Sequence, residues 1–174
     1  MRDAPLSKPR SQALYSVDER RRRDASPWTI VQGVLAPVQF VIFLVSAALV
    51  LRFLANGEGY VAATASIVLK TLALYAIMIT GSIWEKAVFG RYLFAPAFFW
   101  EDVVSMLVLA LHTAYLVVLV LGLMPATGQM ILALLAYASY VINAGQFLLK
   151  LRRARIEQPQ DALARVRLGG EALG

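Results

Sequence analysis

The stretch FFWEDVVSMLVLALHTAYLVVLVLGL, at residues 98–123, decides the fold. It carries few polar side chains and is long enough to cross the roughly 30 Å hydrocarbon core of a bilayer as a helix. Three similar apolar runs lie at 28–51, 60–84 and 126–149. Because lipid cannot satisfy free backbone polar groups, each run must close its own hydrogen bonds as a helix. The sequence therefore predicts an all-α integral membrane bundle of four transmembrane helices.

Composition supports this class and excludes several kinds of site. The 174 residues are 59% hydrophobic and 16% charged, whereas soluble domains are about half apolar and about a quarter charged. There is no cysteine and one histidine. A disulfide framework, a cysteine-ligated metal and a three-histidine metal site are therefore excluded.

Basic residues near the spans predict the orientation. They occur in the polar tails at 1–27 and 150–174 and in the loop between the second and third spans, whereas the first turn has only Arg52, beside Glu58, and the last hinge has no charge. The positive-inside rule places such segments in the cytoplasm, so both termini are expected there. This distribution favours contact with anionic lipid headgroups over nucleic acid.

The third span places polar residues on one helix face. Glu101, Ser105, His112 and Tyr115 recur at helical spacing. Glu101 and His112 are eleven residues apart, or about 16 Å along the axis, so they cannot bond directly. They could contact two ends of one large ligand. Asp102 and Glu101 also suit the N-terminal end of a helix dipole.

The other spans add polar groups that we expect to meet in one pocket open to the cytoplasm. These residues are Gln32 and Gln39 in the first span, Lys70 and Glu85 in the second, and Tyr140, Asn143 and Gln146 in the fourth. For the glutamines, hydrogen bonding between helices is an equal alternative. Lys70, near the bilayer centre, should face the bundle and pair with a protein carboxylate or a substrate carboxylate.

Aromatic residues gather around the loop between the second and third spans. Trp84, Phe94, Phe98 and Trp100 belong to this group. Such residues form interfacial belts in membrane proteins, and they also stack on planar ligands. The sequence leaves both interpretations open.

Four segments together resemble one known family. They are IWEKAVFGRYLFAPAFFWED at 83–102, LHTAY at 111–115, PWTIVQG at 27–33 and YVINAGQFLLK at 140–150. The chain over about 14–155 resembles the vinyl bacteriochlorophyllide hydratases. The resemblance implies a multi-pass hydro-lyase of the bacterial inner or intracytoplasmic photosynthetic membrane. Such an enzyme adds water to the ring-A vinyl group of chlorophyllide a or 3-vinyl bacteriochlorophyllide a, giving the 1-hydroxyethyl derivative. The resemblance also implies that the protein uses no cofactor or metal of its own, because magnesium would enter only within the substrate.

Vinyl hydration needs a proton donor, a positioned water and a base, and the resemblance suggests roles for residues of this chain. Glu101 and Glu85 are the leading candidates for the proton donor, with Asp102 able to tune or replace them. His112 is a candidate base or axial magnesium ligand, the second role being slightly favoured. The expected substrate-binding residues are His112, Trp84, Phe94, Phe98, Trp100, Tyr115, Tyr140, Asn143, Gln146, Gln32, Gln39, Lys70, Lys86 and Arg91. Among them, Lys86, Arg91 or Lys70 would hold the pigment's propionate, and Asn143, Gln146 or Tyr140 would position the water.

Two other functions remain open from the residues alone. A non-catalytic tetrapyrrole carrier or photosystem assembly factor would need the same aromatic mouth but no proton donor. A small transporter would need polar groups through the whole bilayer, whereas the non-cytoplasmic halves of the first and fourth spans are nearly all apolar. Association with other bacteriochlorophyll-synthesis enzymes or with a second copy is a further expectation.

Overall fold

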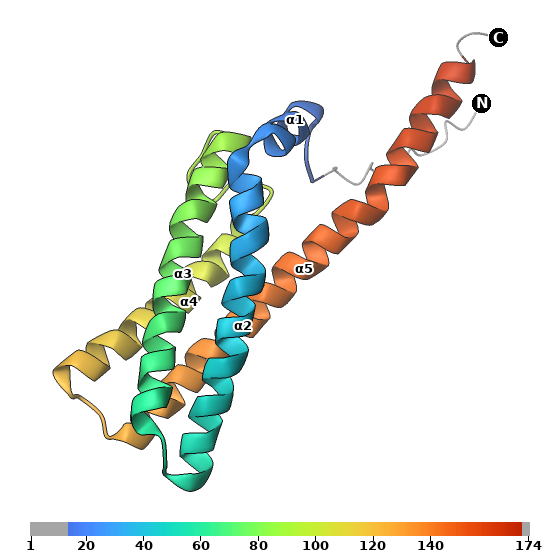
Figure 1. Ribbon diagram of the computed structural model, residues 1–174. Coiled ribbons are helices and arrows are strands. Elements are labelled where there is room, and N and C mark those ends of the chain that lie inside the picture. The colour runs from blue at the N-terminus through green and yellow to red at the C-terminus, as the bar shows by residue number, and fades with distance from the viewer. Residues whose placement is uncertain (1–13, 172–174) are drawn as a thin grey trace, which may run out of the picture.

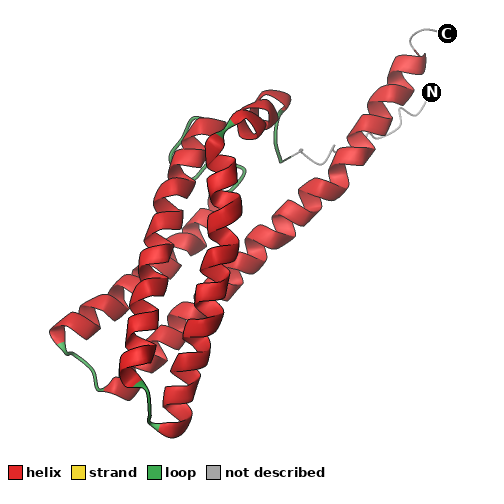
Figure 2. Cartoon of the chain, viewed as in Figure 1, coloured by secondary structure: helices red, strands yellow, loops and turns green. Residues whose placement is uncertain are grey.

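The computed structural model describes residues 14–171, and the described part contains helices and no strand (Figures 1 and 2). Parts of both predicted tails, 1–13 and 172–174, lie outside the described residues. The five helices are α1 (Val17–Ala25), α2 (Pro27–Asn56), α3 (Tyr60–Phe89), α4 (Phe99–Leu121) and α5 (Ala126–Glu171).

Four helices are long and apolar enough to cross a membrane, which confirms the all-α class and the four predicted spans. They are α2, α3, α4 and the part of α5 from Ala126 to Arg152. Helices α2 and α3 form one antiparallel hairpin, and α4 and α5 form another that crosses behind it (Figure 1). Contacts are extensive within each hairpin and sparse between α3 and α4 or α2 and α5. The bundle is thus two tight hairpins joined loosely.

The helix ends extend beyond the apolar runs. Helix α2 continues past position 51 to Asn56, and α3 continues past position 84 to Phe89. Each stops at a glycine, Gly57 or Gly90, with φ of 75° and 80°. This left-handed conformation is open to glycine at low energy, and it ends helices. The extra turn of α3 is important because it carries Glu85.

The predicted tails at 1–27 and 150–174 contain helical structure. Helix α1 begins at a capping box, in which the Ser16 hydroxyl accepts from the Glu19 amide and the Glu19 carboxylate accepts from the Ser16 amide. At the other end, α5 continues as a helix to Glu171. Burial raises the pKa of the Tyr15 phenol, which lies just before α1 against Val88 and Phe98.

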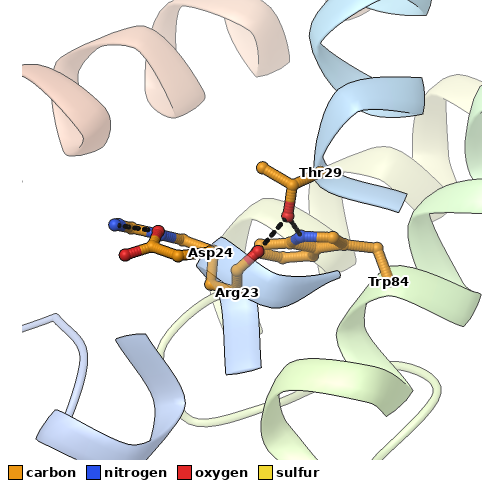
Figure 3. Close-up of polar contacts among 4 residues, drawn as sticks. All are labelled: Arg23, Asp24, Thr29 and Trp84. Carbon is orange, nitrogen blue, oxygen red and sulfur yellow. Dashed lines mark hydrogen bonds and ion pairs between the residues drawn. The ribbon is translucent and has the colours of Figure 1, made fainter. Parts of the chain in front are cut away.

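A hydrogen-bonded chain attaches α1 to the bundle. The Trp84 indole Nε1 donates to Thr29 Oγ1 over 3.0 Å, and that hydroxyl donates to the Arg23 carbonyl over 2.6 Å (Figure 3). On the surface beside it, Arg23 pairs with Asp24 at 2.7 Å (Figure 3). These contacts join α1, α2 and α3 at the end where α3 terminates.

Side-chain hydrogen bonds between α2 and α3 show which residues of the two helices lie opposite one another. Gln32 donates to Thr80 over 2.7 Å, and the Ser46 and Ser66 hydroxyls bond over 2.7 Å, which sets the register of α2 against α3. Ser46 also bonds the Tyr137 hydroxyl of α5. Ser46 therefore ties the two hairpins together about 15 Å before the end of α2.

Candidate active site

Two buried carboxyl groups meet where α3 ends and α4 begins. Glu85 Oε1 accepts the Ala95 amide proton over 2.6 Å, and Asp102 Oδ2 accepts the Phe94 amide proton over 2.7 Å. Their exposed fractions are 4% and 6%. Because Phe94 and Ala95 are consecutive, the two carboxyl groups are held on adjacent amides of the loop. We call Glu85 and Asp102 the carboxyl pair.

The loop between α3 and α4 has an unusual backbone that makes this pairing possible. Phe94 has φ of 59°, and it is the one non-glycine residue with positive φ in the described chain. Such a conformation is strained for a bulky residue and persists only when its surroundings enforce it. Here the two carboxyl groups hold its amide and the next one.

Glu101 lies beside the carboxyl pair and forms an ion pair. Lys150 Nζ of α5 is 2.6 Å from Glu101 Oε2, and Glu101 is only 7% exposed. One turn further along α4, the Asn143 amide donates to Ser105 Oγ over 2.8 Å. Asn143 Oδ1 and Gln146 Oε1 have no hydrogen-bond partner within the described part of the chain. Two free acceptors therefore lie on the α5 face that packs near the acids.

A second group of buried polar residues lies in the middle of the bundle, one from each long helix. We call it the central polar layer: Gln39, Lys70, His112 and Tyr140. Lys70 and His112 have no exposed surface. The Lys70 ammonium lies 3.8 Å from the centre of the Tyr140 ring. Among the residues that the structure describes, the Gln39 Nε2, Lys70 Nζ and His112 Nε2 atoms have no hydrogen-bond partner.

His112 has one ring nitrogen engaged and one free. Its Nδ1 lies 2.8 Å from the Val108 carbonyl oxygen. Because a carbonyl only accepts, Nδ1 carries the proton in this bond and Nε2 presents its lone pair. That is the tautomer in which imidazole binds metals through Nε2. The ring also packs against Tyr137, with centroids 5.9 Å apart.

The predicted aromatic mouth divides into two parts. Trp84, Phe89 and Phe98 pack edge to face, and Phe98 also stacks on Phe147. Trp100 is 69% exposed and Phe94 38% exposed. Trp84 and Phe98 thus belong to a packed internal cluster, whereas Phe94 and Trp100 lie on the outside of the molecule.

The remaining predicted residues separate into buried and surface positions. Tyr115 is fully buried on the His112 face. Gln32 is bonded to Thr80, the helix-to-helix alternative for this residue. Lys86 and Arg91 are exposed, and Lys86 donates to the Gly90 carbonyl over 2.8 Å. Tyr140 lies in the central polar layer, away from the carboxyl pair.

Lys150 is the site residue that sequence reasoning missed. It belongs to the basic segment at 150–174 that predicts the cytoplasmic orientation, and it is not among the predicted site residues. Its spacing from Asn143 and Gln146 places it on their helix face, and this was the available signal. The backbone amides of Phe94 and Ala95 had no sequence signal.

Comparison with known proteins identifies the family. The family model described as 2-vinyl bacteriochlorophyllide hydratase matches residues 15–153. The chain belongs to this family. A 2-vinyl bacteriochlorophyllide hydratase of Rhodobacter capsulatus is 66% identical over 153 residues, covering 88% of this chain and 89% of the relative. Another of Cereibacter sphaeroides is 65% identical over 144 residues, covering 83% and 89%. No solved structure matches the chain.

This membership makes the protein a hydratase, a hydro-lyase of bacteriochlorophyll biosynthesis. The 2-vinyl group of the family description and the 3-vinyl group of the sequence analysis are the same ring-A substituent under two numbering schemes. The carrier and transporter alternatives therefore give way to an enzyme. Its long apolar helices indicate a multi-pass membrane protein.

Proposed function

We propose that the enzyme hydrates the ring-A vinyl group of chlorophyllide a or 3-vinyl bacteriochlorophyllide a between its two helical hairpins, and that the carboxyl pair supplies the proton. The observation that carries this proposal is the meeting of Glu85 and Asp102 on adjacent loop amides, both buried. Two carboxyl groups in contact can hold one proton between them. A protonated carboxyl group is the general acid that vinyl hydration requires.

The reaction then balances with this chain's own groups. The carboxyl pair gives a proton to the terminal vinyl carbon, and the inner carbon becomes a cation conjugated with the macrocycle. A water molecule forms the new C–O bond at the inner carbon. Its surplus proton returns to the carboxylate, which restores the pair. The net change is addition of one water, without a redox step.

Asn143 and Gln146 are suited to position that water. Their free side-chain oxygens, Oδ1 and Oε1, accept hydrogen bonds. A water that donates to such acceptors turns its lone pair toward the electrophilic carbon. Glu101 has a different part in this proposal, because its Oε2 is already bonded to Lys150 Nζ over 2.6 Å.

His112 is suited to bind the substrate's magnesium through its free Nε2. Asp102 and His112 are ten residues apart on α4, or about 15 Å along the axis. Side chains lean toward the N-terminus of their helix. In the antiparallel helices α3 and α4, Glu85 and His112 therefore lean toward each other. A macrocycle with magnesium at its centre and the vinyl group on its rim can bridge the two.

The orientation proposal rests on charge. Arg20, Arg21, Arg22 and Arg23 of α1, together with Lys86, Arg91 and Lys150, lie at the end of the bundle that holds the carboxyl pair. The positive-inside rule assigns this end to the cytoplasm, in a bacterial inner membrane, with anionic lipid at its surface. The catalytic water would then come from the cytoplasmic side.

Conservative substitutions test the proton donor. Glu85→Gln and Asp102→Asn keep an oxygen that accepts the loop amide but cannot give a proton. Each should lower kcat by about 100-fold or more, measured by the absorption change that accompanies loss of vinyl conjugation. Glu101→Gln should retain more turnover, and Glu58→Gln, an exposed carboxylate in the α2–α3 turn, serves as the matched control. Undiminished turnover in both Glu85→Gln and Asp102→Asn would remove the pair from the mechanism.

A further inference from the structure

Lys70 is a buried cation without a counter-charge. It has no exposed surface, and its ammonium nitrogen has no hydrogen-bond partner among the side chains that the structure describes. Its one favourable charge contact is with the face of the Tyr140 ring, 3.8 Å away. The attraction of a cation to an aromatic face is smaller than the cost of removing an ion from water.

No protein carboxylate lies at this level among the residues whose side chains the structure describes. Helix α2 and the part of α5 from Ala126 to Arg152 carry no acid. On α3 the one acid is Glu85, fifteen residues or about 22 Å along the axis from Lys70. The acids of α4 are Glu101 and Asp102, in its first turn. His112 is the other titratable group that faces Lys70 besides the phenols.

The Gln39 side-chain amide lies near this ammonium and has an unpartnered nitrogen among the described residues. The Gln32–Thr80 and Ser46–Ser66 bonds place Gln39 opposite position 73, within one turn of Lys70. Gln39 is 4% exposed and its Nε2 is unpartnered. The ammonium and the amide together present unused N–H donors from α2 and α3, and an anion with two oxygen atoms matches them.

We propose that Lys70, assisted by Gln39, binds the propionate carboxylate of the substrate and makes the enzyme select free-acid pigments over their esters. This inference rests on the proposed function, because it assumes that the pigment lies between the hairpins. Tyr140 and Lys150 are ten residues apart on α5, so the Lys70 and Glu101 levels are about 15 Å apart. The pigment would stand edge-on, with its vinyl group at the carboxyl pair and its propionate at Lys70.

Binding of a pigment that cannot react separates this inference from the mechanism. The probe is the hydroxyethyl product as its free acid and as its propionate methyl ester, titrated into the full-length protein and followed by pigment absorption. Wild type should bind the free acid about 10- to 100-fold more tightly, the value of a hydrogen bond to a charged group. Lys70→Met should abolish the difference, and Lys70→Arg should retain part of it.

The other possible binding results either overturn the Lys70 proposal or separate it from the proposed proton donor. Equal binding of acid and ester by the wild type would overturn the proposal without any variant, and so would an unchanged preference in Lys70→Met. Loss of the preference in Lys86→Met, on the surface, would move the propionate to the loop and equally overturn it. Glu85→Gln should keep the preference, so a wrong proton donor would not be confused with a wrong carboxylate site.

Discussion

Lys150 Nζ lies 2.6 Å from Glu101 Oε2 and connects the fourth membrane helix to the first turn of the third. Glu101 is largely buried, so loss of either partner leaves a charge poorly solvated. We expect Lys150→Met and Glu101→Gln each to lower the free energy of unfolding by about 1–3 kcal/mol. Thermal unfolding of the detergent-purified protein measures this. The exchanged double variant Glu101→Lys/Lys150→Glu should recover part of the loss, and single variants as stable as wild type would contradict the ion pair.

Gln32 is predicted to be a structural contact between helices. Its bond to Thr80 joins α2 and α3. Gln32→Leu should lower the free energy of unfolding by about 0.6 kcal/mol, the average for such bonds in a membrane protein, with KM unchanged. Thr80→Val should have a similar effect, and the double variant should add little. A large rise in KM for Gln32→Leu would instead place this residue against the substrate.

Trp84 is predicted to hold α1 on the bundle. Trp84→Phe keeps much of the aromatic packing but removes the Nε1 bond to Thr29. Helix α1 should then open more often, and trypsin should cut faster at Arg21 and Arg22. The matched control is Trp100→Phe, because Trp100 is on the surface. Equal cleavage rates in all three proteins would show that this bond does not retain α1.

Removal of magnesium from the substrate tests His112. If Nε2 is the axial ligand, wild type should bind the magnesium pigment about tenfold more tightly than the metal-free pigment. We take the coordinate bond to be worth about as much as a hydrogen bond to a charged group. His112→Phe should bind the two pigments equally. Absorption titration gives both constants. A wild type that does not distinguish the pigments would assign His112 to another role.

The apolar spans could be predicted from sequence because their length and continuity follow directly from bilayer thickness. The polar face of Glu101, Ser105, His112 and Tyr115 was also predictable, since helical spacing alone defines it, and it is buried as expected. Helix α1 was harder to predict from the sequence. It is polar on all sides, so its capping box at Ser16 and Glu19 was its main signal.

The contacts of the candidate site could not be predicted, because they depend on how two hairpins are placed against each other. The Glu101–Lys150 ion pair requires the register of α4 on α5. The carboxyl pair requires the loop to turn Phe94 into the left-handed region, which no residue preference signals. The outward direction of Trp100 likewise follows from the rotation of α4. Helical spacing in the sequence determines which residues share a helix face, whereas the packing of the helices determines which residues that face contacts.

The division into two hairpins also bears on how the enzyme is made. Each hairpin is complete in its own helix-to-helix contacts, so each can enter the membrane as a separate unit during synthesis. The carboxyl pair and the central polar layer form only when the units associate. The candidate site therefore depends on the contacts between the two hairpins, which are sparser than those within either hairpin.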